Sequence, residues 1–327
     1  MAETSWTAIE AASSPGRTAD SAALRGRPTR SPARRLRRHD RMAIGAFDAA
    51  AHVFQRRARA VVIGSATILV PTIALNLVLS LIAFDRYSSF DDIAVSPATV
   101  MLGIDAASGV ESLLGYLSIV TSSLSAALVG GYVTALLLQE EFGRDVSAVS
   151  PLRTMVRRLP KLLGGWFFGH IWVLPAALIA VNVSSSALGA LMIPASAVLM
   201  FLVTFTVVVS PTITTENLRP VEGVRRAVRL ARSRFGSSFG FVIITVVVGG
   251  GLRAGITALP RLAESTGLIA FGSYGWLAEG LAGQIAVLLV VPIVALASAQ
   301  LYLQLRADAE GMDIVMAADE AFVTGRR

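Results

Sequence analysis

The sequence predicts an all-α, polytopic membrane protein with six transmembrane helices, and three observations support this fold class. The chain is apolar: 54% of its 327 residues are hydrophobic, 16% are charged and the mean hydropathy is +0.64, whereas soluble domains carry about 25% charged residues. The apolar residues are concentrated in tracts long enough to cross a hydrocarbon core of about 30 Å. The basic residues gather in alternate connections between those tracts, a pattern typical of membrane topology.

Residues 1–41 precede the first apolar tract and are rich in Ser, Pro and Arg without apolar periodicity, so we expect a disordered cytoplasmic tail. No apolar stretch follows the arginines within the first thirty residues, as a signal peptide would require. The basic cluster could contact anionic lipid headgroups at about 1 kcal/mol per charge, bind nucleic acid, or only signal topology. The adjacent membrane span favours lipid over nucleic acid, so no nucleic-acid partner is predicted. The lipid-headgroup candidates are Arg34, Arg35, Arg37 and Arg38.

The membrane domain is predicted over 42–306, followed by a cytoplasmic tail at 307–327. Long connections at 85–112 and 260–279, and a Ser-rich turn between spans three and four, separate the apolar tracts on one side. The six spans are expected at 61–84, 113–139, 163–182, 188–212, 238–259 and 280–303.

Lys and Arg lie almost entirely on the other side of these spans. Residues 1–60 contain twelve, the 140–162 connection five, the 213–237 connection six and the C-terminal tail three. The opposite side contains only Arg86, Arg253 and Arg261. The positive-inside rule therefore predicts a multi-pass protein of the cytoplasmic (inner) membrane with both termini in the cytoplasm.

Each basic cytoplasmic segment is predicted to form an amphipathic helix ahead of an odd-numbered span. An apolar stripe with the spacing i, i+3, i+7, i+10, i+14 recurs three times, with arginines on the other faces. Helices of this kind lie in the headgroup plane with the stripe toward lipid, and we name them elbows. The stripes are Ile44, Phe47, Ala51, Phe54 and Ala58 in the first elbow (44–58), Val149, Leu152, Val156, Leu159 and Leu163 in the second (149–163), and Val221, Val224, Val228, Ala231 and Phe235 in the third (221–235).

A helix-weakening residue follows each elbow at a similar distance. Pro71 lies 27 residues after the first stripe begins, and Pro175 lies 26 after the second. Gly249, Gly250 and Gly251 lie 28 to 30 after the third, and both Pro and consecutive Gly weaken a helix. We therefore predict three parallel repeats of elbow plus helical hairpin, arranged as a pseudo-threefold bundle. Such repeats differ from the inverted repeats common in secondary transporters.

Two segments resemble a known family. They are "SPTITTENLRPVEGVRRAVRLARSRFG" (Ser210–Gly236) and "LYLQLRADAEGMDI" (Leu301–Ile314). Both look like the membrane domain attached to some bacterial glycerophosphoryl diester phosphodiesterases, and like stand-alone actinobacterial-type membrane proteins of that kind. The resemblance covers about residues 43–315. The activity of those enzymes belongs to a separate soluble catalytic barrel, for which the non-membrane residues here are too few, so no catalytic residue is transferred.

Polar residues within the spans are candidates for function, because ionisable groups are costly inside a membrane. His170 could act as a functional group or could hydrogen-bond a neighbouring helix. Arg253 could bind an anionic group or could extend to the outer interface. The remaining intramembrane candidates, Asn76, Asn182 and Gln284, are expected to form interhelical hydrogen bonds.

Three acids are expected to pair with elbow arginines. Glu141, Glu216 and Glu310 lie at the cytoplasmic ends of spans two, four and six. The third elbow offers Arg225 and Arg229 as partners, and Glu310 is expected to meet the first elbow. The result would be a ring of salt bridges rather than a catalytic triplet, because bulk solvent and basic partners surround these acids.

No cysteine, paired catalytic acids, metal-ligand spacing or known catalytic motif is present in the sequence. We therefore expect no enzymatic activity and no cofactor. The predicted function is a membrane protein that organises lipids or partner proteins through its elbows and basic tail. The alternatives are a small-solute or lipid transporter with a central cavity between kinked helices, and an intramembrane enzyme acting on a lipid headgroup. A polar cavity at mid-depth would favour transport, whereas an apolar centre would favour the organising role.

Overall fold

The computed structural model describes residues 42–84, 109–141, 147–175, 197–272 and 275–311. Within these ranges the chain is helical and contains no β-strand, which confirms the all-α class. The elements are α3 (Met42–Phe84), α6 (Gly109–Glu141), α7 (Val149–Arg157), α8 (Leu159–His170), α11 (Val209–Glu216), α12 (Pro220–Ser233), α13 (Phe235–Ile244), the π-helical turn η5 (Thr245–Gly249), α14 (Gly250–Ser265) and α15 (Gly275–Glu310).

Five helices in the described ranges are long and apolar enough to cross a membrane, so the chain is a multi-pass membrane protein. They correspond to predicted spans one, two, four, five and six. Predicted span three, 163–182, extends past the described residues: α8 ends at His170, and helical backbone resumes after a turn as far as Pro175. The five helices are Met42–Asn76, Ile119–Glu140, Ala197–Glu216, Phe235–Ser265 and Gly280–Glu310.

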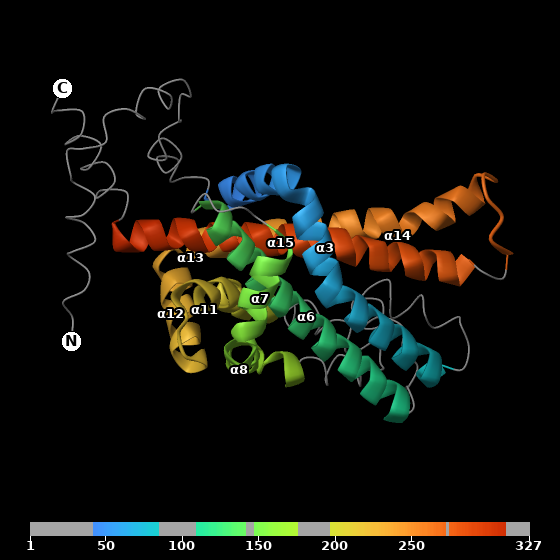
Figure 1. Cartoon of the computed structure of the whole chain (residues 1–327). Helices are drawn as coiled ribbons and strands as arrows, with labels where there is room; N and C mark the ends of the chain where they lie inside the picture. Colours follow the sequence, from blue (N-terminus) through green and yellow to red (C-terminus); the bar gives the residue numbers. More distant parts are fainter. Residues whose placement is uncertain (1–41, 85–108, 142–146, 176–196, 273–274, 312–327) are drawn as a thin grey trace, which may run out of the picture.

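Each elbow contains an arginine with non-helical backbone, which lies near the end of the first and third elbows and within the second. The first elbow is the start of α3, which bends sharply at Arg57 (φ −126°, ψ 23°; Figure 1). The second elbow runs from α7 into α8 across Arg158 (φ −98°, ψ 3°). The third is α12, which Arg234 (φ −133°, ψ 54°) separates from α13. A basic residue therefore lies at every change of direction.

The apolar stripes of the elbows are divided between two environments. Their first residues, Ile44, Val149 and Val221, are exposed, as expected of side chains that face lipid. The side chains three positions later pack partly against the core. The residues two and six positions after each stripe begins are buried, and most are Ala or Gly, which permit close helix contact. These buried residues are Ala46, Ala50, Pro151, Met155, Gly223 and Ala227.

The predicted helix break at Pro71 is wrong. Backbone dihedrals in α3 stay helical through Pro71, which is exposed, and membrane helices in general accommodate proline without a break. In the fifth span the backbone widens into the π-helical turn η5, which Gly249 ends, before Gly250 and Gly251 continue as α-helix. Pro175 follows the turn at residues 171–172.

Helix α15 is at the centre of the bundle, where it contacts α3, α6, α11, α12 and α14. The pairs α3–α6 and α14–α15 diverge from the end of the molecule that holds α7, α12 and the C-terminus of α15 (Figure 1). We call this end the basic end, and it comprises the elbows and the last turns of α6, α11 and α15. The described core is mainly aliphatic, with the buried rings of Tyr132, Phe241 and Tyr302.

Two close contacts hold the spans together near the basic end. Tyr132 of α6 packs against Gly64 of α3, where an added Cβ would lie 2.0 Å from the ring, and its hydroxyl donates to the Ala60 carbonyl at 2.7 Å. In the fourth span, Pro211 lacks the N–H that would otherwise bond the Val207 carbonyl. The Ser298 hydroxyl of α15 donates to that carbonyl instead, at 2.6 Å.

Candidate functional site at the basic end

The third elbow is set in place by the short connection that follows α11. Asn217 ends α11 in the left-handed conformation (φ 54°), and its N–H donates to the Ile213 carbonyl. Pro220 then begins α12, where its missing N–H is not needed. Lys161 of α8 donates to the backbone and side-chain oxygens of Asn217 at 2.8 and 2.9 Å. The ends of α8, α11 and α12 are therefore joined at one point.

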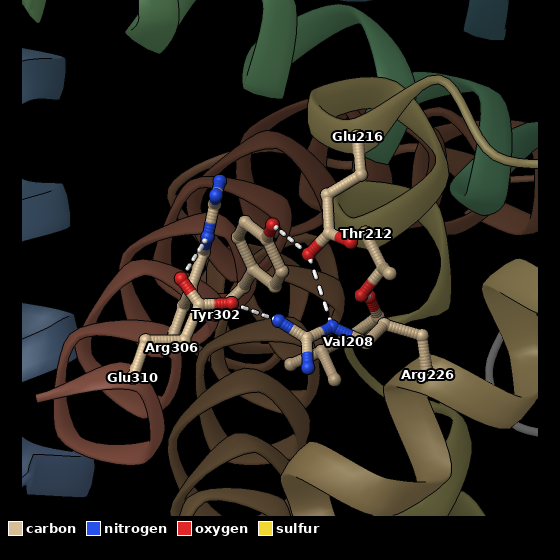
Figure 2. A network of polar contacts seen from close by, with 7 residues as sticks. All are labelled: Val208, Thr212, Glu216, Arg226, Tyr302, Arg306 and Glu310. Atoms are coloured by element: carbon tan, nitrogen blue, oxygen red, sulfur yellow. Dashed lines mark hydrogen bonds and ion pairs between the residues drawn. The ribbon is translucent and has the colours of Figure 1, made fainter.

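Arg226 of α12 connects the third elbow to two spans (Figure 2). Its Nε donates to Glu216 at the end of α11 at 3.3 Å, and its Nη2 contacts Glu310 at the end of α15. The side chains of Arg226 and Glu216 are only 22% and 16% exposed, so solvent screens this contact less than a surface pair. The guanidinium lies between the two carboxylates, which would otherwise repel each other.

Helix α15 contributes the other half of the network. The Tyr302 hydroxyl donates to the same Glu216 oxygen at 2.8 Å, and Arg306 donates to Glu310 at 2.9 Å. Further along, Arg234 donates to Asp308 through two nitrogens, in the bidentate geometry that guanidinium favours. Both carboxylates in Figure 2 therefore accept from an arginine, and the network joins α11, α12 and α15.

The electrostatics of the third elbow follow from these contacts. Partial burial lowers the pKa of Arg226, but Glu216 and Glu310 outweigh it, so the pKa lies above its ordinary value. The Asp308 carboxylate raises the pKa of Arg234. In the second elbow the opposite holds, because burial alone lowers the pKa of Arg158. Among the described residues, the second elbow thus differs from the third in forming no ion pair with a carboxylate.

The structure corrects the predicted ring of salt bridges. Glu310 contacts Arg226 of the third elbow rather than the first elbow, because α12 lies against α15. Arg225 and Arg229 are exposed and form no ion pair with any described residue, since they point away from the bundle. Glu216 and Glu310 therefore both pair with an elbow arginine, as predicted, but they share Arg226 of the third elbow.

At the end of α6, the residue before the predicted acid forms an ion pair. Glu140 contacts Arg56 of the first elbow at 3.0 Å, while the side chain of Glu141 lies outside the described residues. One sequence signal identifies Glu140: it follows the buried Tyr132 by eight residues, as Glu310 follows the buried Tyr302. Arg226 had no such signal, because Gly223 and Leu230, the buried residues on its side of the helix, do not belong to the predicted apolar stripe.

The intramembrane candidates are dispersed rather than gathered into one site. Asn76 of α3 donates to Ser122 at 3.2 Å and accepts from Thr121 at 3.0 Å, so it joins α3 to α6. His170 is half-buried at the end of α8, and no described group hydrogen-bonds its Nδ1.

Arg253 and Gln284 are half-buried on α14 and α15. Across the described ranges, no group of three or more His, Asp or Glu side chains could hold a metal ion. Asn182 and the tail arginines Arg34, Arg35, Arg37 and Arg38 lie outside the described residues.

Comparisons with known proteins assign no relative: no protein-family model, curated protein or solved structure matches the chain.

Proposed function

We propose that the chain organises anionic lipids or partner proteins at the cytoplasmic surface of the inner membrane and has no catalytic role. The observation that carries this proposal is the construction of the elbows. Each places exposed apolar side chains beside arginines at the basic end, as helices that lie in the headgroup layer do. The count of basic residues supports a cytoplasmic location for this end and for both termini.

The contacts of the elbows support the proposed pseudo-threefold repeat. The first elbow lies beside α15, where Gly45 approaches Gln304. The second elbow contacts α6 through the hydrogen bond between Gln139 and Ser150, and the third contacts α11. Each elbow thus lies against the return span of the preceding unit in a closed cycle. We also propose that the chain is related to the membrane domain of bacterial glycerophosphoryl diester phosphodiesterases.

The second candidate is a small-solute or lipid transporter. It is favoured by irregular backbone within two spans, at Val208 and in η5, because such irregularities often lie at functional sites. The described core favours the organising role, since aliphatic side chains and packed tyrosines fill it. Its buried hydroxyls bond largely to carbonyls of their own helices, as Thr134 does to Gly130 and Thr212 to Val208.

Mass spectrometry of lipids and proteins that co-purify in a mild detergent tests the proposal. We expect anionic phospholipid to be enriched over its share of the source membrane, or a membrane-protein partner at fixed stoichiometry. Lipid in bulk proportions together with a stoichiometric soluble ligand would instead favour the transporter.

A further inference from the structure

The three elbows differ in how far acidic side chains neutralise them. The third elbow has four carboxylates on it or against it, those of Glu216, Glu222, Asp308 and Glu310. The first elbow has Asp48 on its own helix and Glu140 of α6 paired with Arg56.

The second elbow and the helix that follows contain no acid at all over 147–175. Its four cations are Arg153, Arg157, Arg158 and Lys161, and none forms an ion pair with a described residue. The second elbow therefore concentrates positive charge without an internal counter-charge.

Two of these cations lie beside an apolar edge. Arg153 and Arg157 are exposed and four residues apart, so they are neighbours on one side of α7. Val149 and Val156, which are 66% and 54% exposed, adjoin them on the same helix. Like charges at this spacing repel each other, and an anion between them would relieve the repulsion. Their guanidinium groups have the geometry that binds phosphate oxygens through paired hydrogen bonds.

A second exposed apolar edge follows on α8 and on the residue after it. Leu163, Phe167 and Ile171 are exposed at intervals of four residues, and Phe168 is exposed beside them. Phe167 lies about 12 Å along the helix axis from the start of α8. A ligand bound here would thus meet cationic side chains at one end and aliphatic and aromatic side chains at the other.

We propose that the second elbow is a binding site for one anionic phospholipid, with its phosphate between Arg153 and Arg157 and an acyl chain along Leu163, Phe167 and Ile171. This inference rests on the proposed function and assigns its lipid selectivity to one elbow. Charge complementarity selects the headgroup, since a zwitterionic lipid would carry its own cation into a site that already holds four. The exposed edge on α8 favours a lipid phosphate over free phosphate, because apolar side chains beside the arginines place the site next to the acyl chains of the membrane.

The test is native mass spectrometry of the delipidated full chain titrated with phosphatidylglycerol, phosphatidylcholine or inorganic phosphate. Three variants are compared with the wild type: R153Q/R157Q, the charge-preserving R153K/R157K, and R225Q/R229Q as a control that removes the same charge from the third elbow. We expect R153Q/R157Q to weaken phosphatidylglycerol binding roughly thirtyfold, the lysine variant to weaken it less, and the control to stay within about threefold of wild type.

Each other outcome overturns a definite part of the inference. If R153Q/R157Q and R225Q/R229Q weaken phosphatidylglycerol binding equally, binding depends on the overall charge of the protein rather than on this site. Unchanged binding in R153Q/R157Q would place the lipid elsewhere while leaving the proposed function intact. Displacement of phosphatidylglycerol by low concentrations of inorganic phosphate would identify a soluble-anion site instead. If the wild type does not prefer phosphatidylglycerol to phosphatidylcholine, the lipid-binding arm of the proposed function fails as well.

Discussion

Replacing Arg226 with Met should destabilise the bundle more than the same change at any exposed arginine of the third elbow. The substitution keeps an unbranched side chain but removes the cation between Glu216 and Glu310. Removing one partner of a buried ion pair costs about 3–5 kcal/mol, because the other charge is left uncompensated. Arg226 and its acids are partly exposed, so we expect about 2–3 kcal/mol, between the buried and surface values.

Unfolding in mixed micelles, followed by circular dichroism as a denaturing detergent is added, measures this difference. Arg225→Met is the matched control, because the neighbouring side chain is exposed and has no ion pair with a described residue. Adding Glu216→Gln to Arg226→Met should restore part of the stability by removing one uncompensated charge. Equal unfolding midpoints for the Arg226 and Arg225 variants would refute the view that Arg226 joins the elbow to the spans.

Three further substitutions test the contacts that hold the spans together. Gly64→Ala should cost about 1–3 kcal/mol by overpacking, because the new methyl group would overlap the ring of Tyr132, and thermal unfolding in detergent would show it. Ser298→Ala should cost about 1–2 kcal/mol and increase amide hydrogen exchange near Val207, whose carbonyl loses its donor. Tyr302→Phe should cost about 1.5–3 kcal/mol, because its hydroxyl donates to a partly buried carboxylate.

Matched controls separate these effects from general intolerance of the helices. Gly250→Ala adds the same methyl group where nothing lies within 4 Å, so it should leave stability unchanged or raise it. Thr67→Ala removes a hydroxyl that bonds only to its own helix, and it should cost less than Ser298→Ala. If either control is as damaging as its test variant, packing and hydrogen bonding at the specific contacts are not the cause.

Sequence patterns predicted the elements of this fold better than their contacts. The register of the elbows was visible because amphipathic spacing and arginine placement follow from helix geometry. The first and third elbows end next to an arginine with non-helical backbone, whereas in the second elbow this arginine lies five residues before the end. The buried face of each elbow was not visible. In a membrane protein apolar side chains face lipid as readily as protein, so Ala46 and Gly223 mark contact surfaces through small size rather than hydrophobicity.

The presence of salt bridges at the basic end could be predicted from the sequence, but the residues that pair with each other could not. Acids at the ends of spans beside basic elbows indicated salt bridges, and Glu216 indeed forms one. The order of the helices around the bundle is not encoded in any local pattern, so the contact of Glu310 with the third elbow could not be derived. Pro71 shows a related limit, because whether a proline interrupts a membrane helix depends on what satisfies the freed carbonyl.

Single-cysteine accessibility tests the central claim most directly, because the chain has no cysteine of its own. Cysteines introduced at Ser150 and Arg225, in the second and third elbows, should react with a membrane-impermeant maleimide only after the inner membrane is opened. A cysteine at Ser265, the last residue of α14, should react in intact spheroplasts. Labelling of residues 150 and 225 from outside, or recovery of the chain in the soluble fraction without detergent, would contradict the account.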